Sequence, residues 1–180
     1  MNKALLSAAA IVLLNTSVFA IELNTEGAYA GGALALESID PLDSGIAVVL
    51  TGGVPFEQDD DLGPGIFALE TELTYSLISP SVDTGLGGTY DLSLLTLGAY
   101  AAYIYEINEQ IFVKPRLGLI YKTLNSSYGG TTSASASEIG LALGLQGGYK
   151  LNDQIDITVG LNLVDSTNIT HLTVGMQYHY

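Results

Sequence analysis

The stretch His-Leu-Thr-Val-Gly-Met-Gln-Tyr-His-Tyr, residues 171–180, alternates strictly between two kinds of side chain. One face carries a large apolar series, formed by Leu172, Val174, Met176, Tyr178 and Tyr180. The residues between them are polar or small, and a repeat of two residues predicts a β-strand with two different surroundings. Such a strand lies either between a protein core and water, or between lipid and the polar lumen of a membrane barrel. The rest of the chain decides between these two.

The first twenty residues have the three parts of a secretory signal peptide. A basic start containing Lys3 precedes an apolar run over residues 4–14, and Val18-Phe19-Ala20 forms the small-residue exit. That run is too short for the ~20 residues that a membrane-spanning helix needs, so an uncleaved anchor is not favoured. We therefore expect a signal peptide over residues 1–20 and a single domain over residues 21–180.

Acidic residues dominate the charge of the chain. Five basic residues stand against 19 acidic ones, and the formal net charge is −14. Nucleic-acid binding is excluded, because no basic patch could replace phosphate counterions. The absence of cysteine removes disulfides, cysteine metal sites and thiol chemistry. A small exported domain without disulfides needs another source of stability, and a barrel in a bilayer supplies one because its backbone hydrogen bonds are all internal.

Hydrophobic residues make up 48% of the chain and charged residues 13%, yet the longest apolar candidate, residues 92–104, is too short for a transmembrane helix. The apolar residues instead alternate in eight predicted strands, at 28–36, 45–54, 66–77, 90–105, 111–124, 138–151, 155–163 and 171–180. Short turns at 107–110 and 152–154 alternate with longer connections at 37–44, 79–89 and 125–137, a pattern typical of outer-membrane barrels. The connection at 55–65 is longer than a typical periplasmic turn. Pro115 cannot donate to a ladder, so we expect it near the rim or at a bulge.

Two stretches carry a resemblance to a known family. One is the end of the chain with Tyr178 and Tyr180, and the other is Ala-Leu-Glu-Thr-Glu-Leu-Thr-Tyr at residues 68–75, which is similar to the family's acidic third strand. Through these and its overall pattern, the chain resembles the small eight-stranded outer-membrane barrels that include OmpX and the transmembrane domain of OmpA.

The resemblance implies an all-β fold, an eight-stranded antiparallel up-and-down barrel in the outer membrane of a Gram-negative bacterium. It also implies that the barrel-assembly machinery recognises the last strand through Val174, Met176, Tyr178 and Tyr180. A peptidoglycan-binding domain of the OmpA type is not expected, because nothing follows Tyr180 in the sequence.

Four charged residues are predicted to face the lumen. Glu70 and Glu72 lie on the third strand, and Lys114 and Arg116 lie at a similar height on the fifth. An eight-stranded barrel is only wide enough for side chains to fill it, and an unpaired charge inside costs several kcal/mol. We expect a structural ion cluster that plugs the lumen; the alternative, suggested by the resemblance, is a gated conduit.

His171 and His179 raise an enzymatic alternative, because the resemblance extends to outer-membrane barrels that are lipid hydrolases or acyltransferases. A Ser–His–acid site needs all three groups within hydrogen-bond reach. His171 could approach Ser126, Ser133 or Asp165, but no motif defines any of these as a site. We expect two lumen-facing polar histidines, no enzymatic activity and no cofactor.

Acidic segments raise the question of metal binding. Residues 57–61 contain four acids, but the spacing does not match an EF-hand, so we expect a solvated acidic turn and no metal site. The loop residues Glu37, Asp40, Asp43 and Asp83 could bridge to lipopolysaccharide through divalent ions.

The sequence predicts a monomeric barrel, surrounded by outer-membrane lipid and lipopolysaccharide, with a filled polar lumen. Its expected role is structural or surface-interactive, in envelope integrity, adhesion or resistance. The alternatives are a porin-type channel for small solutes or ions, a lipid-modifying enzyme and, in a different class, a soluble lipocalin-like barrel with its faces reversed.

Overall fold

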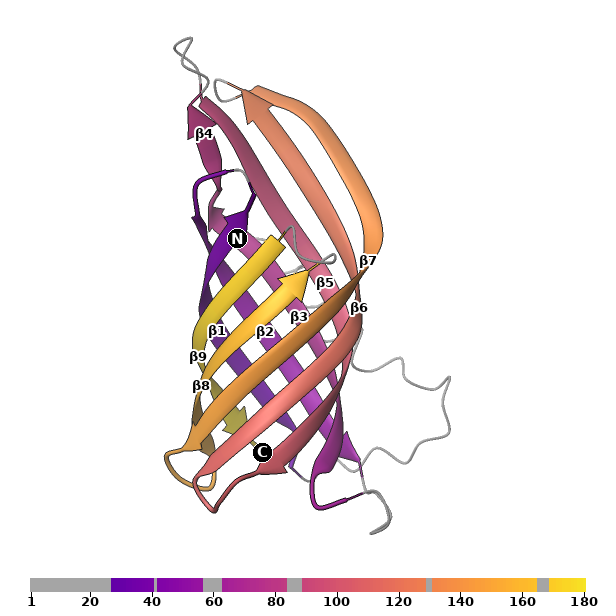
Figure 1. Cartoon of the computed structure of the whole chain (residues 1–180), viewed down its shortest axis with the longest axis vertical. Coiled ribbons are helices and arrows are strands. Elements are labelled where there is room, and N and C mark those ends of the chain that lie inside the picture. Colours follow the sequence, from indigo (N-terminus) through magenta and orange to yellow (C-terminus); the bar gives the residue numbers. More distant parts are fainter. Residues whose placement is uncertain (1–26, 41, 57–62, 84–88, 129–130, 165–168) are drawn as a thin grey trace.

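The computed structural model describes residues 27–40, 42–56, 63–83, 89–128, 131–164 and 169–180. These residues form one antiparallel sheet of tilted strands wrapped around a long axis (Figure 1). Its strands are β1 (Tyr29–Ile39), β2 (Gly45–Phe56), β3 (Ile66–Ile78), β4 (Ser81–Asp83), β5 (Thr89–Glu106), β6 (Ile111–Tyr128), β7 (Thr131–Lys150), β8 (Ile155–Val164) and β9 (Ile169–His179). Within the same ranges, no helix is long and apolar enough to span a membrane.

The sheet closes on itself. β1 pairs with β9, and β3 pairs with β5, so no long strand remains at an edge of the barrel wall. The short β4 pairs with β5 above β3 and continues its line after Pro80. The described residues therefore form a closed antiparallel barrel of eight long strands, as predicted.

The alternation of the strands points their large apolar side chains outward. On β9, Leu172, Val174 and Met176 are about half exposed, while Thr173 between them is buried. The same alternation places apolar residues outside on each long strand, including Leu143 on β7. A water-soluble protein rarely exposes such a continuous apolar surface, whereas a membrane barrel requires it. The soluble lipocalin-like alternative is therefore wrong, because its apolar side chains would point inward.

The predicted loop at residues 125–137 is wrong. β6 continues to Tyr128 and β7 begins at Thr131, with pairs such as Asn125↔Ser135 between them. The serine-rich and threonine-rich composition suggested a loop, but small hydroxyl side chains are compatible with a ladder when a neighbouring strand supplies the partners. The result is a tall β6–β7 hairpin that rises above the ends of β8 and β9 (Figure 1).

Two further predictions differ in detail. β1 continues to Ile39, so the predicted break at 37 begins three residues later, and the predicted 79–89 connection contains β4.

Pro115 lies near the beginning of β6, as predicted, but the register of the β5–β6 ladder is the same on both sides of it. Pairing lapses only opposite Tyr103 and Ile104, because proline has no N–H to donate.

The lumen is polar over only part of its length. At the end where the longer connections lie, inward side chains form an apolar cluster, here called the apolar plug: Ile39, Leu94, Tyr100, Ile120, Ala142, Val164 and Ile169. The prediction of a polar lumen throughout is therefore wrong at this end. Alternation alone could not show it, because it assigns a side to each residue and not the height at which inward residues meet.

Candidate functional site

The structure brings together the four charged residues predicted to face the lumen. Lys114 Nζ lies 2.5 Å from Glu70 Oε1, and Arg116 Nη1 lies 3.1 Å from Glu70 Oε2. Arg116 Nη2 also binds Glu72 Oε2. All four side chains are buried. Because β5 separates β3 from β6 in the sheet, these contacts depend on curvature, which turns both strands toward the same interior.

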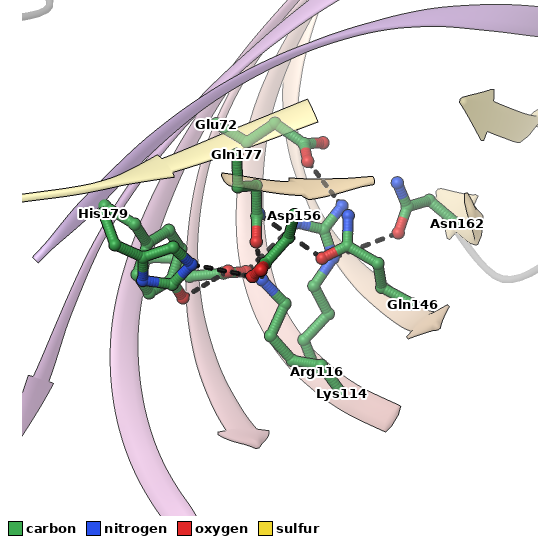
Figure 2. Close-up of polar contacts among 10 residues, drawn as sticks. Glu72, Lys114, Arg116, Gln146, Asp156, Asn162, Gln177 and His179 are labelled. Atoms are coloured by element: carbon green, nitrogen blue, oxygen red, sulfur yellow. Dashed lines mark hydrogen bonds and ion pairs between the residues drawn. The ribbon is translucent and has the colours of Figure 1, made fainter. Parts of the chain in front are cut away.

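Other inward side chains complete this ion cluster. The Tyr29 hydroxyl donates to Glu70 Oε1 at 2.6 Å, and Arg116 Nε donates to Asn162 Oδ1 at 3.1 Å. Figure 2 shows Arg116 between Glu72 and Asn162. The guanidinium also lies 4.6 Å from the Tyr100 ring centroid. Charges removed from water need several such partners, so the cluster is compensated rather than merely buried.

Sequence reasoning missed Tyr29, Tyr100 and Asn162 as members of the cluster. Each lies on a different strand from the four charged residues, and none is charged. Their alternation could have assigned them to the inward face, but only the register sets them at the height of Arg116.

A second buried pair lies nearer the apolar plug. His171 Nε2 lies 3.2 Å from Glu37 Oε2, and the Ser76 hydroxyl donates to Glu37 Oε1 at 2.7 Å. Glu37 was predicted on an external loop; instead it points into the barrel and is fully buried, because β1 continues past it.

This arrangement does not form a nucleophile–histidine–acid relay. Ser76 contacts the carboxylate rather than the imidazole, and His171 Nδ1 has no hydrogen-bond partner among the described residues. Ser126 is one of the residues that His171 was predicted to approach. Its hydroxyl instead donates a hydrogen bond to the carbonyl of Ala134 at 3.4 Å. Asp165 and the side chain of Ser133 lie outside the described residues.

The opposite end of the lumen contains a cavity of about 870 Å³, lined at its inner end by Tyr29, Lys114 and Gln177. His179 lies on its wall, with Nε2 at 2.7 Å from Asp156 Oδ2 (Figure 2). Each of the eight long strands contributes lining residues. From this end to the other, the lumen therefore passes from a cavity through the ion cluster to the apolar plug.

The end of the barrel with the longer connections is acidic. Its described carboxylates outside the lumen are Asp40, Asp43, Asp83, Asp91 and Glu138, and Lys122 is its basic residue, 2.6 Å from Glu138. The described part of the chain holds no group of three or more histidine or acidic residues suited to a metal ion. The acidic run at 57–61 lies outside the described residues.

The side chains predicted as the assembly signal all lie on the outer surface of β9 and just after it. Val174, Met176, Tyr178 and Tyr180 are between 42% and 75% exposed. The Tyr178 and Tyr180 rings meet edge-on with centroids 5.3 Å apart. An apolar edge ending in two aromatic rings is therefore available to a partner or to lipid.

Comparisons with known proteins agree with this architecture. A family model described as "Outer membrane protein beta-barrel domain" matches residues 6–179. Among solved structures, OprG from Pseudomonas aeruginosa is 16% identical with a TM-score of 0.58, over 89% of this chain and 99% of that one. Ail, the attachment invasion locus protein of Yersinia pestis, solved with the heparin analogue sucrose octasulfate, is 16% identical with a TM-score of 0.56, over 86% and 99%. Neisserial surface protein A is 19% identical with a TM-score of 0.55, over 87% and 98%. At these identities the solved structures share the fold alone, and comparison with curated sequences finds no match.

Proposed function

Because the chain belongs to the outer membrane protein beta-barrel domain family and is an outer-membrane protein, we propose that it has a structural or surface-interaction role in the cell envelope. In such barrels the short turns face the periplasm and the longer connections face outward. The turns after β5 and β7 then mark the periplasmic end, and the apolar plug and the tall β6–β7 hairpin mark the external end. Cleavage after residue 20 and recognition of β9 by the assembly machinery remain parts of this proposal.

The observation that carries the proposal is the closure of the lumen at two levels. At the ion cluster, Arg116 and Lys114 neutralise Glu70 and Glu72 across the interior. Above it, the side chains of the apolar plug other than Tyr100 carry no polar groups to replace the hydration shell of an ion, and hydrophobic constrictions of this kind stop conduction by excluding water. A solute would have to displace both levels.

Conductance in planar bilayers tests this closure. We expect purified protein to give no steady conductance on the order of a nanosiemens, because an eight-stranded barrel leaves no open lumen. A variant with Leu94→Ser and Ile120→Ser makes the plug polar but leaves the ion cluster intact, so it should stay closed. Steady conductance from the wild-type protein that increases with the amount of protein added would refute the proposal.

A channel for small solutes or ions is the second candidate function. The cavity of about 870 Å³ at the periplasmic end favours it, because the lumen is already open at that end. If the channel candidate is correct, the two plug substitutions should raise conductance. No arrangement of described residues favours the enzymatic alternative, since Ser76 and His171 meet only through Glu37.

The negative charge of the external end indicates which partners the proposed role would involve. Ail was solved with a sulfated ligand, but the five carboxylates and one paired lysine that the described residues place at the external end would repel such a polyanion. We propose instead that basic partners, or lipopolysaccharide bridged by divalent ions, approach this end. The barrel itself is proposed to be a monomer in contact with outer-membrane lipid.

A further inference from the structure

The cavity at the periplasmic end of the lumen has two unlike sides. Its volume of about 870 Å³ falls within the range of small-molecule sites in proteins. Its aliphatic and phenyl side chains come from β2, β3, β5, β6 and the segment before β3, and include Ile66, Ile104 and Phe112. The side chains from β7, β8, β9 and the β7–β8 turn are all polar, and include Asp153 and Asp156. A ligand that fills this cavity therefore meets an apolar wall on one side and a polar wall on the other.

The apolar side of the cavity is incompletely covered by the protein. Ile66 has the same parity on β3 as the buried Ala68 and Glu70, so its side chain is on the lumen side of the wall. It is nevertheless 46% exposed, and Ile104, its partner on β5, is half-buried. Removing apolar surface from water is favourable, so this side of the cavity selects a ligand with an apolar body.

A buried carboxylate lies on the polar side. Asp156 is only 3% exposed, and its Oδ2 lies 2.7 Å from His179 Nε2 (Figure 2). Its other oxygen, Oδ1, has no hydrogen-bond partner among the described residues. Because a buried carboxylate needs partners for both of its oxygens, Asp156 is able to accept a further hydrogen bond from a donor in the cavity.

The lysines that line the cavity already have carboxylate partners. Lys114 Nζ and Lys150 Nζ each lie 2.5 Å from a carboxylate oxygen. In contrast, Glu109 and Asp153 in the turns at the cavity mouth are exposed and have no ion-pair partner among the described residues. Walls that carry uncompensated charge of one sign focus the field inside a recess, so this cavity attracts cations and disfavours anions.

We propose that this cavity binds an amphipathic organic cation, a small molecule that joins one ammonium or guanidinium group to an apolar body. The cationic group donates to Asp156 Oδ1, and the apolar body covers Ile66 and the apolar wall around it. A metal ion alone would leave that wall uncovered, and the described residues hold no group suited to one. The site lies at the opposite end of the barrel from the proposed surface-interaction role, and binding needs no passage through the apolar plug.

Amide chemical shifts of the isotope-labelled barrel in nanodiscs of zwitterionic lipid, recorded during ligand titration, test the proposal. The probe is the 2-phenylethylammonium ion, and two probes of nearly the same shape replace its charge: the neutral 2-phenylethanol and the anionic 3-phenylpropionate. We expect the ammonium probe to shift the amides of Ile66 and Asp156. It should bind about ten-fold more tightly than the neutral probe, which corresponds to one charge-assisted hydrogen bond, and the anionic probe should bind most weakly.

Substitutions separate the buried carboxylate from the rim. Asp156→Asn keeps a hydrogen-bond acceptor for His179 but removes the charge, so the affinity for the ammonium probe should fall about ten-fold. Asp43→Asn neutralises an exposed carboxylate at the external end, and this matched control should leave the affinity unchanged. Glu109→Gln with Asp153→Asn alters exposed rim side chains only, so the ammonium probe should bind about two- to three-fold more weakly at low salt and equally well at high salt.

Three outcomes would overturn the proposal: equal affinity for the ammonium and neutral probes, equal affinity of the Asp156→Asn and Asp43→Asn variants for the ammonium probe, or shifts confined to lipid-facing residues such as Leu143. If Asp156→Asn does not assemble, judged by heat-modifiable gel migration, the three probes and the rim variant decide without it. Because the probe enters from the periplasmic end, the result is independent of the conductance test and of the external surface role.

Discussion

Removing Arg116 should destabilise the barrel more than the loss of any surface ion pair. In the Arg116→Ala variant, Glu70 keeps Lys114 Nζ at 2.5 Å and the Tyr29 hydroxyl at 2.6 Å. Among the described residues, Glu72 keeps only the Tyr100 hydroxyl, at 3.5 Å. A buried charge that loses its partner costs about 3–5 kcal/mol, so we expect a loss of about 4 kcal/mol in the free energy of unfolding.

Most of this loss in unfolding free energy should come from the buried Glu72 carboxylate, which no longer has a cationic partner. Neutralising Glu72 in the Arg116→Ala, Glu72→Gln double variant removes that charge, and about half of the lost stability should return. The two substitutions are then coupled by at least about 2 kcal/mol, within the range for residues that touch in one network. Lys150→Ala is the matched control, because its pair with Glu106 is 32% and 47% exposed and such pairs contribute about 0–1 kcal/mol.

Urea unfolding at equilibrium in lipid vesicles, followed by gel migration and tyrosine fluorescence, measures these differences. The chain has 11 tyrosines and no tryptophan, so tyrosine is the intrinsic reporter. If Arg116→Ala costs no more than Lys150→Ala, or if the Arg116 and Glu72 effects simply add, the ion cluster does not stabilise the barrel in the way proposed.

Three other experiments test the packing of the wall, its orientation and the assembly of the barrel. A Cβ at Gly118 would lie 2.4 Å from a backbone carbonyl oxygen, so Gly118→Ala should cost about 1–3 kcal/mol of unfolding free energy; Gly147→Ala, with open space around it, should cost less than about 0.5, and equal costs would contradict the packing. Leu143→Arg puts a charge on the lipid-facing surface and should cost about 2–4 kcal/mol in the same urea assay, whereas Ser135→Arg on the external hairpin should be nearly neutral. Deleting Tyr180 should lower the amount of assembled barrel in cells but leave folding of purified protein into vesicles unchanged; normal assembly in cells would remove Tyr180 from the proposed signal.

The sequence by itself determined the class of fold and the two faces of its wall. Strict alternation on the last strand, with Val174 and Met176 on one side and Thr173 on the other, is a local property, because successive side chains of a strand point to opposite faces. The same reasoning assigned Glu70, Glu72, Lys114 and Arg116 to the interior. It failed at 125–137, where composition suggested a loop although a neighbouring strand supplies the ladder.

Only the tertiary structure decided which inward residues meet. Register and curvature set Tyr29 and Asn162 beside the charged residues, buried Glu37 against His171, and gathered the apolar plug from strands distant in the chain. The two sides of the periplasmic cavity also depend on closure, since no feature of the sequence alone shows that Ile66 and Asp156 line the same space. Alternation is encoded residue by residue, whereas height and closure arise from pairing between strands.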